Sequence, residues 1–218
     1  MLQKKIIKNL NLKRIRYLPT NISKLYFSIP KIILRLFFKF NLWHISSYRH
    51  RKYAISIVKH ANAKEIRNKA LEIGCGLGDI IRRLDYNTKV GLDNDVQVLK
   101  AARFVSKVFD KNKTDFNFYD LVNSDTLNEI YDVVLVPNFA HAISSKILKK
   151  KIEHIFLNNL SDSGEIILDV IEDKNLQNYR NFHSIDYLSE SIECEIYKIG
   201  EFKHSRTIYS ISKKSNHL

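Results

Sequence analysis

A glycine-rich segment and the acidic residues around it are the part of this sequence best suited to chemistry. Residues 69–84, KALEIGCGLGDIIRRL, predict a buried strand, a turn that contains Gly74, Gly76 and Gly78, and a helix opened by Asp79. Glycine allows backbone conformations and close approaches that other residues prevent, so turns of this kind commonly hold nucleotide-type cofactors. The segment therefore predicts a cofactor loop.

The identity of the residue at position 79 narrows the choice of cofactor. A dinucleotide-binding loop has its third glycine where this sequence has Asp79, and a carboxylate there would repel a pyrophosphate group. The G-x-x-x-x-G-K-[ST] phosphate loop is absent as well. These observations favour S-adenosylmethionine, which carries no phosphate and whose sulfonium cation tolerates nearby carboxylates.

The sequence LEIGCGLGD, residues 71–79, resembles the first motif of class I S-adenosylmethionine-dependent methyltransferases, E/D-x-G-x-G-x-G. The resemblance implies that Asp93, at the end of the second predicted strand, holds the ribose hydroxyls, and that Asp120 lies near the adenine. Asp95, by contrast, is expected to cap the following helix. The residues that the resemblance assigns to the cofactor are Glu72, Gly74, Cys75, Gly76, Gly78, Asp93, Asn94, Asp120, Leu121 and Asn138.

Alternating strand and helix patterns from residue 69 onward predict an α/β fold. Predicted strands cover 69–74, 89–93, 115–120, 132–138 and 165–171, with helices over 95–109 and 145–160. Two alternating segments, 193–202 and 205–214, predict a C-terminal antiparallel hairpin. We therefore expect a Rossmann-like class I methyltransferase fold, with a doubly wound, mixed seven-stranded sheet and a helical N-terminal extension.

His141 follows the fourth predicted strand, where enzymes of this family meet their substrate. Histidine titrates near neutral pH, so His141 is a candidate base for a hydroxyl acceptor. The alternative is a histidine at a helix start that is hydrogen-bonded to backbone. The sequence VPNF at 136–139 is not the D/N-P-P-F/Y/W motif of enzymes that methylate exocyclic amino groups of bases, and no Pro-Cys is present for carbon-5 methylation of cytosine.

The net charge of +13 comes from the N-terminal part of the chain. Residues 1–60 contain 14 Lys and Arg and no Asp or Glu, whereas the remainder is close to neutral. We divide the chain into a basic helical extension, 1–62, and an S-adenosylmethionine-binding domain, 63–218. The excess charge indicates an anionic partner, either a membrane surface or nucleic acid.

Residues 24–43 predict an amphipathic helix with Ser28 as its cap and Pro30 in its first turn. Its basic edge consists of Lys24, Lys31, Arg35 and Lys39, and its apolar face of Leu25, Ile29, Ile33, Leu34, Leu36, Phe37 and Phe40. Interior charges argue against a membrane span, and the pattern suits the surface of an anionic membrane. Packing on the domain or on another subunit is the alternative, and RNA contact is a third interpretation.

Residues 42–62 carry a dense set of polar aromatic and basic side chains just before the cofactor loop. The run WH…YR…Y is similar to the segment before the glycine motif in small methyltransferases of bacterial capsule and O-antigen gene clusters. This similarity implies a substrate-covering segment that binds a glycan, and the alternative is ordinary capping and packing. The candidate substrate-binding residues are Trp43, His44, Tyr48, Arg49, Arg51 and Tyr53.

Cys75 and Cys194 are the two cysteines, and they form neither a metal-type spacing nor a disulfide framework. With no signal-peptide pattern at the N-terminus, a cytoplasmic protein without a metal is expected. Peripheral attachment to the inner face of the cell membrane is compatible with this expectation. The favoured function is O-methylation of a sugar in a surface glycan or in its lipid-linked precursor. The alternatives are an RNA methyltransferase that uses the basic extension, and a catalytically silent cofactor-binding subunit of a partner enzyme.

Overall fold

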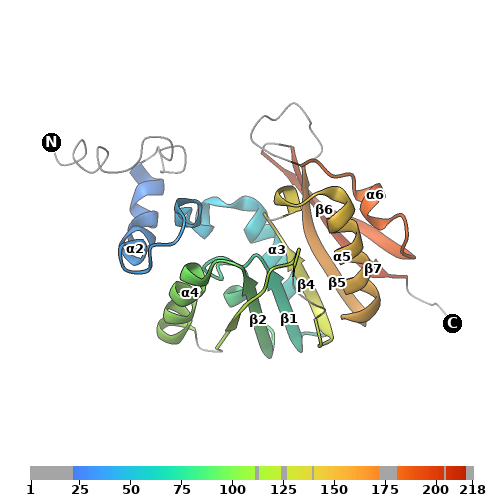
Figure 1. Cartoon of the computed structure of the whole chain (residues 1–218), viewed down its shortest axis with the longest axis horizontal. Coiled ribbons are helices and arrows are strands. Elements are labelled where there is room, and N and C mark those ends of the chain that lie inside the picture. The colour runs from blue at the N-terminus through green and yellow to red at the C-terminus, as the bar shows by residue number, and fades with distance from the viewer. Residues whose placement is uncertain are drawn as a thin grey trace.

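A seven-stranded sheet in the order β3-β2-β1-β4-β5-β7-β6 forms the centre of the computed structural model (Figure 1). The structure describes residues 22–110, 113–123, 127–138, 140–171, 181–203 and 205–214, with side chains from residue 28 onward. The strands are β1 Lys69–Ile73, β2 Thr88–Asp93, β3 Asp115–Phe118, β4 Tyr131–Val136, β5 Leu160–Ile171, β6 Cys194–Phe202 and β7 Arg206–Lys213. β7 is antiparallel to β5 and β6, whereas the other neighbouring pairs are parallel. The predicted mixed sheet with a C-terminal hairpin is confirmed.

Helices cover both faces of the sheet, because strand residues that alternate in direction are apolar on both sides. The helices are α2 Ile22–Phe38, α3 Lys52–Asn62, α4 Val96–Phe109, α5 Ser145–Asn158 and α6 Ile185–Ser189, with 3-10 turns η2 Leu42–Ile45, η3 Tyr48–His50, η4 Ile81–Arg83 and η5 Ala140–Ala142. Val134 belongs to the core under α5 and α6, which includes Leu148. Its neighbour Val133 belongs to the core under α3 and α4, which includes Ile57 and Leu99. The last part of segment 1–62 is thus packed into the domain core.

The extension helix α2 lies beside α4 (Figure 1). It begins at Ile22, so the prediction that Ser28 caps it is wrong: residues upstream continue the helix, and Pro30 removes one backbone donor without ending it. It also ends earlier than predicted, at Phe38, because Lys39 adopts a φ of 55° and donates its N–H to the Arg35 carbonyl at 2.8 Å. The predicted helix over 24–43 is therefore shifted toward the N-terminus.

Phe40 anchors the extension to the domain. It is buried in a small cluster with Leu77 of the glycine loop and Val98 of α4. The prediction that Phe40 lies on the free apolar face of the helix is therefore wrong, since the chain leaves the helix before this residue and turns back to the domain.

The predicted helix after the glycine loop is replaced by turns and the short η4. The connection from β1 to β2, residues 74–87, has 14 residues, and the glycine turn at 74–78 takes the first five. A parallel crossover of a dozen residues or more usually includes a helix. Here only residues 79–87 remain after the glycine turn, and they form turns and the short η4 before β2 begins.

Candidate cofactor and acceptor site

The glycine loop follows β1 at the carboxyl end of the parallel strands, beside the centre of the sheet. Gly74, Gly76 and Gly78 all have positive φ values, of 73°, 55° and 70°, which side chains disfavour. The amides of Gly74 and Cys75 donate to the Leu92 carbonyl at 2.8 and 2.9 Å, so the loop is fixed to the end of β2. All three glycines are therefore required by the backbone conformation.

Two of these glycines are also closely covered. A Cβ at Gly76 would lie 2.6 Å from His44 Nδ1, and one at Gly78 would lie 2.5 Å from the Phe116 ring. Through His44, the segment 42–62 is therefore in direct contact with the glycine loop. The loop is thus held between the extension on one side and β3 on the other.

Asp93, at the end of β2, fixes the loop through its carboxylate. Its two oxygens accept from the amides of Gly76, at 2.8 Å, and Asp95, at 2.9 Å. The side chain is buried, and burial raises its pKa. Asp95 itself accepts from the Gln97 and Val98 amides, which confirms it as the cap of α4, and Asn94 between the two acids is exposed.

Glu72 and Cys75 lie beneath the loop. Glu72 is buried near the end of β1 and accepts from the Ile81 amide at 2.9 Å. Burial raises its pKa to about 8, against the effect of that hydrogen bond. Cys75 is buried with a raised pKa, so its thiol fills space rather than acting as a nucleophile.

Asp120 and Leu121 follow β3, next to the end of β2. The Tyr119 amide donates to the Asp93 carbonyl at 3.1 Å, which brings the two strand ends together. Asp120 accepts from the Val122 amide at 3.0 Å and from Asn123 Nδ2 at 2.9 Å, and Leu121 is buried. The positions assigned to ribose and adenine are therefore adjacent.

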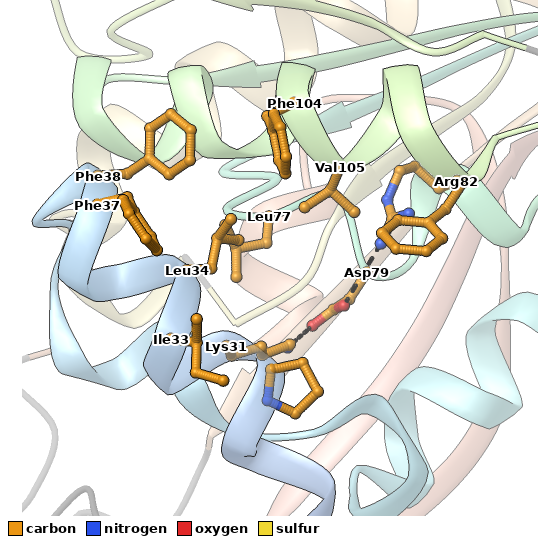
Figure 2. Close-up of a pocket in the computed structure, with 12 residues that line it drawn as sticks. Lys31, Ile33, Leu34, Phe37, Phe38, Leu77, Asp79, Arg82, Phe104 and Val105 are labelled. Atoms are coloured by element: carbon orange, nitrogen blue, oxygen red, sulfur yellow. Dashed lines mark hydrogen bonds and ion pairs between the residues drawn. The ribbon is translucent and has the colours of Figure 1, made fainter.

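Asp79 does not open a helix; it joins the extension to the loop. Its carboxylate forms ion pairs with Lys31 of α2 and Arg51 (Figure 2 shows the Lys31 pair). Burial opposes ionisation of Asp79, but these two cations outweigh it and hold its pKa below the usual range. Lys31 also donates to the Ser46 carbonyl at 2.8 Å. Lys31 thus faces the domain, and its assignment to an outward basic edge is wrong.

The other candidate substrate residues surround this contact or lie nearby. His44 is packed against the loop and accepts from Trp43 Nε1, and burial lowers its pKa to about 4. Trp43 is largely exposed, as is Arg49. Tyr48 stacks under the Arg83 guanidinium, 4.1 Å from ring centroid to Cζ.

A second polar cluster lies at the carboxyl ends of β4 and β5. Asn138 has a φ of 57°, donates its amide to Asp169 Oδ1 at 2.6 Å and accepts from Arg206 at 2.8 Å. Arg206 and Asp169 form an ion pair at 2.8 Å, and both are buried. Tyr53 of α3 covers the guanidinium, 4.3 Å from its Cζ. Asp169 of β5 therefore fixes the backbone N–H of Asn138, and Arg206 of β7 fixes its side-chain oxygen.

His141 lies in η5, just after Asn138. Burial lowers its pKa, while nearby Asp169 acts in the opposite direction. A neutral imidazole at pH 7 is the form that accepts a proton. The turn is held in place by buried His183, whose Nε2 donates to the Ala140 carbonyl at 2.9 Å.

Asp169, Arg206, Lys31 and His183 were not predicted as site residues. Asp169 carries a usable signal, since it is a lone carboxylate in the apolar strand IILDVI, and a buried strand tolerates a charge only with a partner. Its partner Arg206 lies 37 positions away on β7, so the pairing requires the sheet order.

Two absences concern only the described part of the chain. No helix there combines the length and hydropathy needed to cross a bilayer. Its side chains include no group of three or more His, Cys, Asp or Glu placed to hold a metal ion.

The fold of this chain is similar to the folds of solved methyltransferase structures, whereas comparisons of its sequence find no match. The sequence matches no protein-family model and no curated protein. A S-adenosylmethionine-dependent methyltransferase from Clostridium acetobutylicum ATCC 824 is similar with a TM-score of 0.64 at 14% identity, covering 87% of this chain and 99% of that one. The N-methyltransferase NodS from Bradyrhizobium japonicum WM9, in complex with S-adenosyl-L-homocysteine, also gives 0.64 at 14% identity, covering 85% and 98%.

Magnesium protoporphyrin IX methyltransferase (ChlM) from Synechocystis PCC 6803, with bound S-adenosyl-L-homocysteine, gives a TM-score of 0.63 at 14% identity, covering 88% of this chain and 99% of that one. The chain therefore has the fold of class I S-adenosylmethionine-dependent methyltransferases.

Proposed function

We propose that this protein is a S-adenosylmethionine-dependent methyltransferase that methylates a hydroxyl group of a sugar, in a surface glycan or in its lipid-linked precursor. The observation that carries the proposal is the loop of three positive-φ glycines, fixed by Asp93 through the Gly76 amide. This loop lies at the carboxyl ends of β1 and β2, where open α/β sheets bind their ligands.

The residues around the loop fit S-adenosylmethionine. His44 and Phe116 occupy the space that a Cβ at Gly76 or Gly78 would need, so the loop presents backbone without side chains at these two positions. Asp93 and Asp120 lie at adjacent strand ends, where they would hold the ribose and adenine. Buried Glu72 would face the cationic methionine part. When bound, the cofactor supplies an electrophilic methyl group.

The cluster after β4 would hold the acceptor. Asn138, which the resemblance assigned to the cofactor, is exposed; its backbone is fixed by Asp169 and its side-chain oxygen by Arg206, so its side-chain amide can bind and orient a hydroxyl group. His141, neutral at pH 7, would accept the proton that this hydroxyl group loses. Exposed Trp43 offers an apolar ring for the face of a sugar.

Transfer of labelled methyl groups tests the proposal. The purified protein is incubated with methyl-labelled S-adenosylmethionine and cell extract, which is then fractionated into lipid-linked glycan, RNA and protein. Label in the glycan fraction is expected. Label confined to RNA or protein would contradict the acceptor, and failure to bind S-adenosyl-L-homocysteine in calorimetry would contradict the cofactor.

The role of His141 is tested by His141→Ala, with His154→Ala on α5 as the matched control. Loss of a general base lowers turnover by about 100-fold or more. Affinity for S-adenosyl-L-homocysteine should stay within about twofold, since the proton acceptor is not part of the donor site. Turnover equal to that of the control would show that His141 is not the base.

We also propose that the extension binds the surface of an anionic membrane. α2 exposes Ile29, Ile33, Leu36 and Phe37, the last with 77% of its surface accessible, although its basic residues Lys31 and Arg35 are partly buried. An exposed aliphatic and aromatic face next to a basic chain end suits an interfacial helix. Sedimentation with phosphatidylglycerol vesicles at low salt should capture the protein, and no capture would contradict this proposal.

A further inference from the structure

A cavity of about 680 Å³ lies between α2, α4 and the glycine loop (Figure 2). Leu34, Phe37 and Phe38 line it from α2, and Phe104, Val105 and Phe109 line it from α4. The Phe38 and Phe104 rings meet at one end, with centroids 5.7 Å apart. Volumes of 300–1,000 Å³ are typical of ligand pockets rather than of packing defects.

The apolar walls of this cavity continue to its mouth. Phe37 and Phe109 are 77% and 72% exposed, and Phe104 is 50% exposed. Large side chains on two adjacent helices normally close on each other, because contact removes them from water. Here they leave an open apolar channel between them (Figure 2).

The opposite end of the cavity, at the glycine loop, is cationic. Lys31, Asp79 and Arg82 line it (Figure 2). Asp79 is shared between Lys31 and Arg51, while Arg82 pairs with Asp110 at 3.3 Å. Among the residues that line the cavity, the two cations Lys31 and Arg82 therefore face a single carboxylate, that of Asp79. Such an end attracts an anionic group.

We infer that this cavity binds a single-chain amphiphile, with its apolar chain between α2 and α4 and its anionic headgroup at Lys31 and Arg82. The apolar walls that α2 and α4 contribute account for the chain, and the excess of one cation at the loop end of the lining accounts for the headgroup. The inference does not depend on methyl transfer, because every residue that carries it lies outside the cluster after β4.

Oleate, used below its aggregation limit, is the first probe because it has both an apolar hydrocarbon chain and an anionic headgroup. Calorimetry with the full chain should give saturable binding of one oleate, and oleyl alcohol should bind at least about tenfold more weakly because it lacks the charge. Farnesyl phosphate is the second arm: tighter binding than oleate indicates an isoprenoid phosphate, and the reverse indicates a fatty acid. Absence of saturable binding in both arms overturns the inference.

Two valines of α4 provide matched variants. Val105 lines the cavity, whereas Val108, three residues further along, is exposed and is not part of the lining. Val105→Trp should fill the channel and lower oleate affinity by at least about tenfold, while Val108→Trp should leave it within about twofold. Equal affinities for the two variants overturn the inference.

Further measurements separate this site from the cofactor site and from other occupants. S-adenosyl-L-homocysteine should bind Val105→Trp as it binds the unaltered protein, which also shows that the variant is folded. Competition between oleate and S-adenosyl-L-homocysteine would overturn a separate site. Capture by phosphatidylglycerol vesicles without binding of monomeric oleate, or a dimer that only Val105→Trp dissociates, would assign the face to a bilayer or to a second copy instead.

Discussion

The two ends of the site that we propose for the methyl donor and for the acceptor, here called the donor end and the acceptor end, are built in different ways. At the donor end, the shape comes from backbone: three glycines with positive φ and the amides of Gly74 and Gly76, fixed by groups at the end of β2. At the acceptor end, it comes from side chains, where Asp169 and Arg206 of two different strands fix Asn138.

This difference has consequences for what mutations do. A backbone site is disturbed mainly where a side chain intrudes or where an anchoring carboxylate is lost. A side-chain site that depends on a buried ion pair is disturbed together with folding, because an unpaired charge in the core is very unfavourable. Mutations at the acceptor end should therefore lower stability and turnover together. Mutations at the donor end should mainly lower the affinity for the cofactor.

The largest effect is expected from Arg206→Met. It leaves Asp169, which is 2% exposed, without its ion-pair partner. Removal of one member of a buried pair costs about 3–5 kcal/mol, measurable as a lower free energy of unfolding in urea. Turnover should fall as well, since Asn138 loses its hydrogen bond to Arg206.

An exposed pair is the control for this variant. Lys149 and Glu190 are 2.8 Å apart, but 67% of the Glu190 side chain is accessible, so Lys149→Met should leave the free energy of unfolding almost unchanged. The double variant Asp169→Leu with Arg206→Met should regain stability but not turnover. If it regains both, the ion pair supports folding alone.

Asp93→Ala tests the donor end. It leaves the buried amide of Gly76 without its acceptor and removes the carboxylate proposed to hold the ribose. We expect affinity for S-adenosyl-L-homocysteine to fall by about 100-fold, measured by calorimetry.

Asp95→Ala is the matched variant two residues away. It removes the cap of α4 and should cost about 1 kcal/mol of stability, with cofactor affinity changed less than about threefold. Equal losses of affinity in Asp93→Ala and Asp95→Ala would mean that α4 as a whole, rather than the anchoring of Gly76, determines binding.

The same difference explains what could be predicted from sequence. Gly74, Gly76, Gly78 and Asp93 lie within one short stretch of the sequence, so the glycine loop and the acid at the end of the next strand are predictable. Asp169 and Arg206 are brought together by the antiparallel β7, and no local pattern joins them. Register and sheet order, not spacing, create that cluster.

The extension shows the limit of helical periodicity as a guide. The pattern over 24–43 indicates an amphipathic helix but not which face the domain takes. Asp79, interpreted from sequence as a helix-opening acid, in fact pairs with Lys31 and so turns this one basic side chain toward the domain. A buried ion pair between distant segments can thus determine the direction of a side chain that helical periodicity leaves open.

The smallest expected effect is a pH dependence at the donor end, from Glu72. Burial raises its pKa to about 8, so the ligand-free protein holds a proton there at pH 7. A cation at this position favours the carboxylate and releases the proton. Affinity for S-adenosylmethionine should therefore rise by roughly threefold to tenfold from pH 6.5 to 8.5, and Glu72→Gln should remove most of that rise.

The pH dependence of the stability of the ligand-free protein is a second test of the protonation of Glu72. A carboxyl group whose folded pKa lies above its unfolded value loses its contribution to stability as pH rises through that folded value, here between about 4.5 and 8. Lys31, whose pKa burial lowers to about 8 despite Asp79, acts in the opposite sense and only above that pH. The melting temperature of the unaltered protein should therefore fall more between pH 6 and pH 8 than the melting temperature of Glu72→Gln. If the two melting temperatures change equally over this range, Glu72 is already ionised in the free protein, and the donor end binds its cofactor without exchanging a proton.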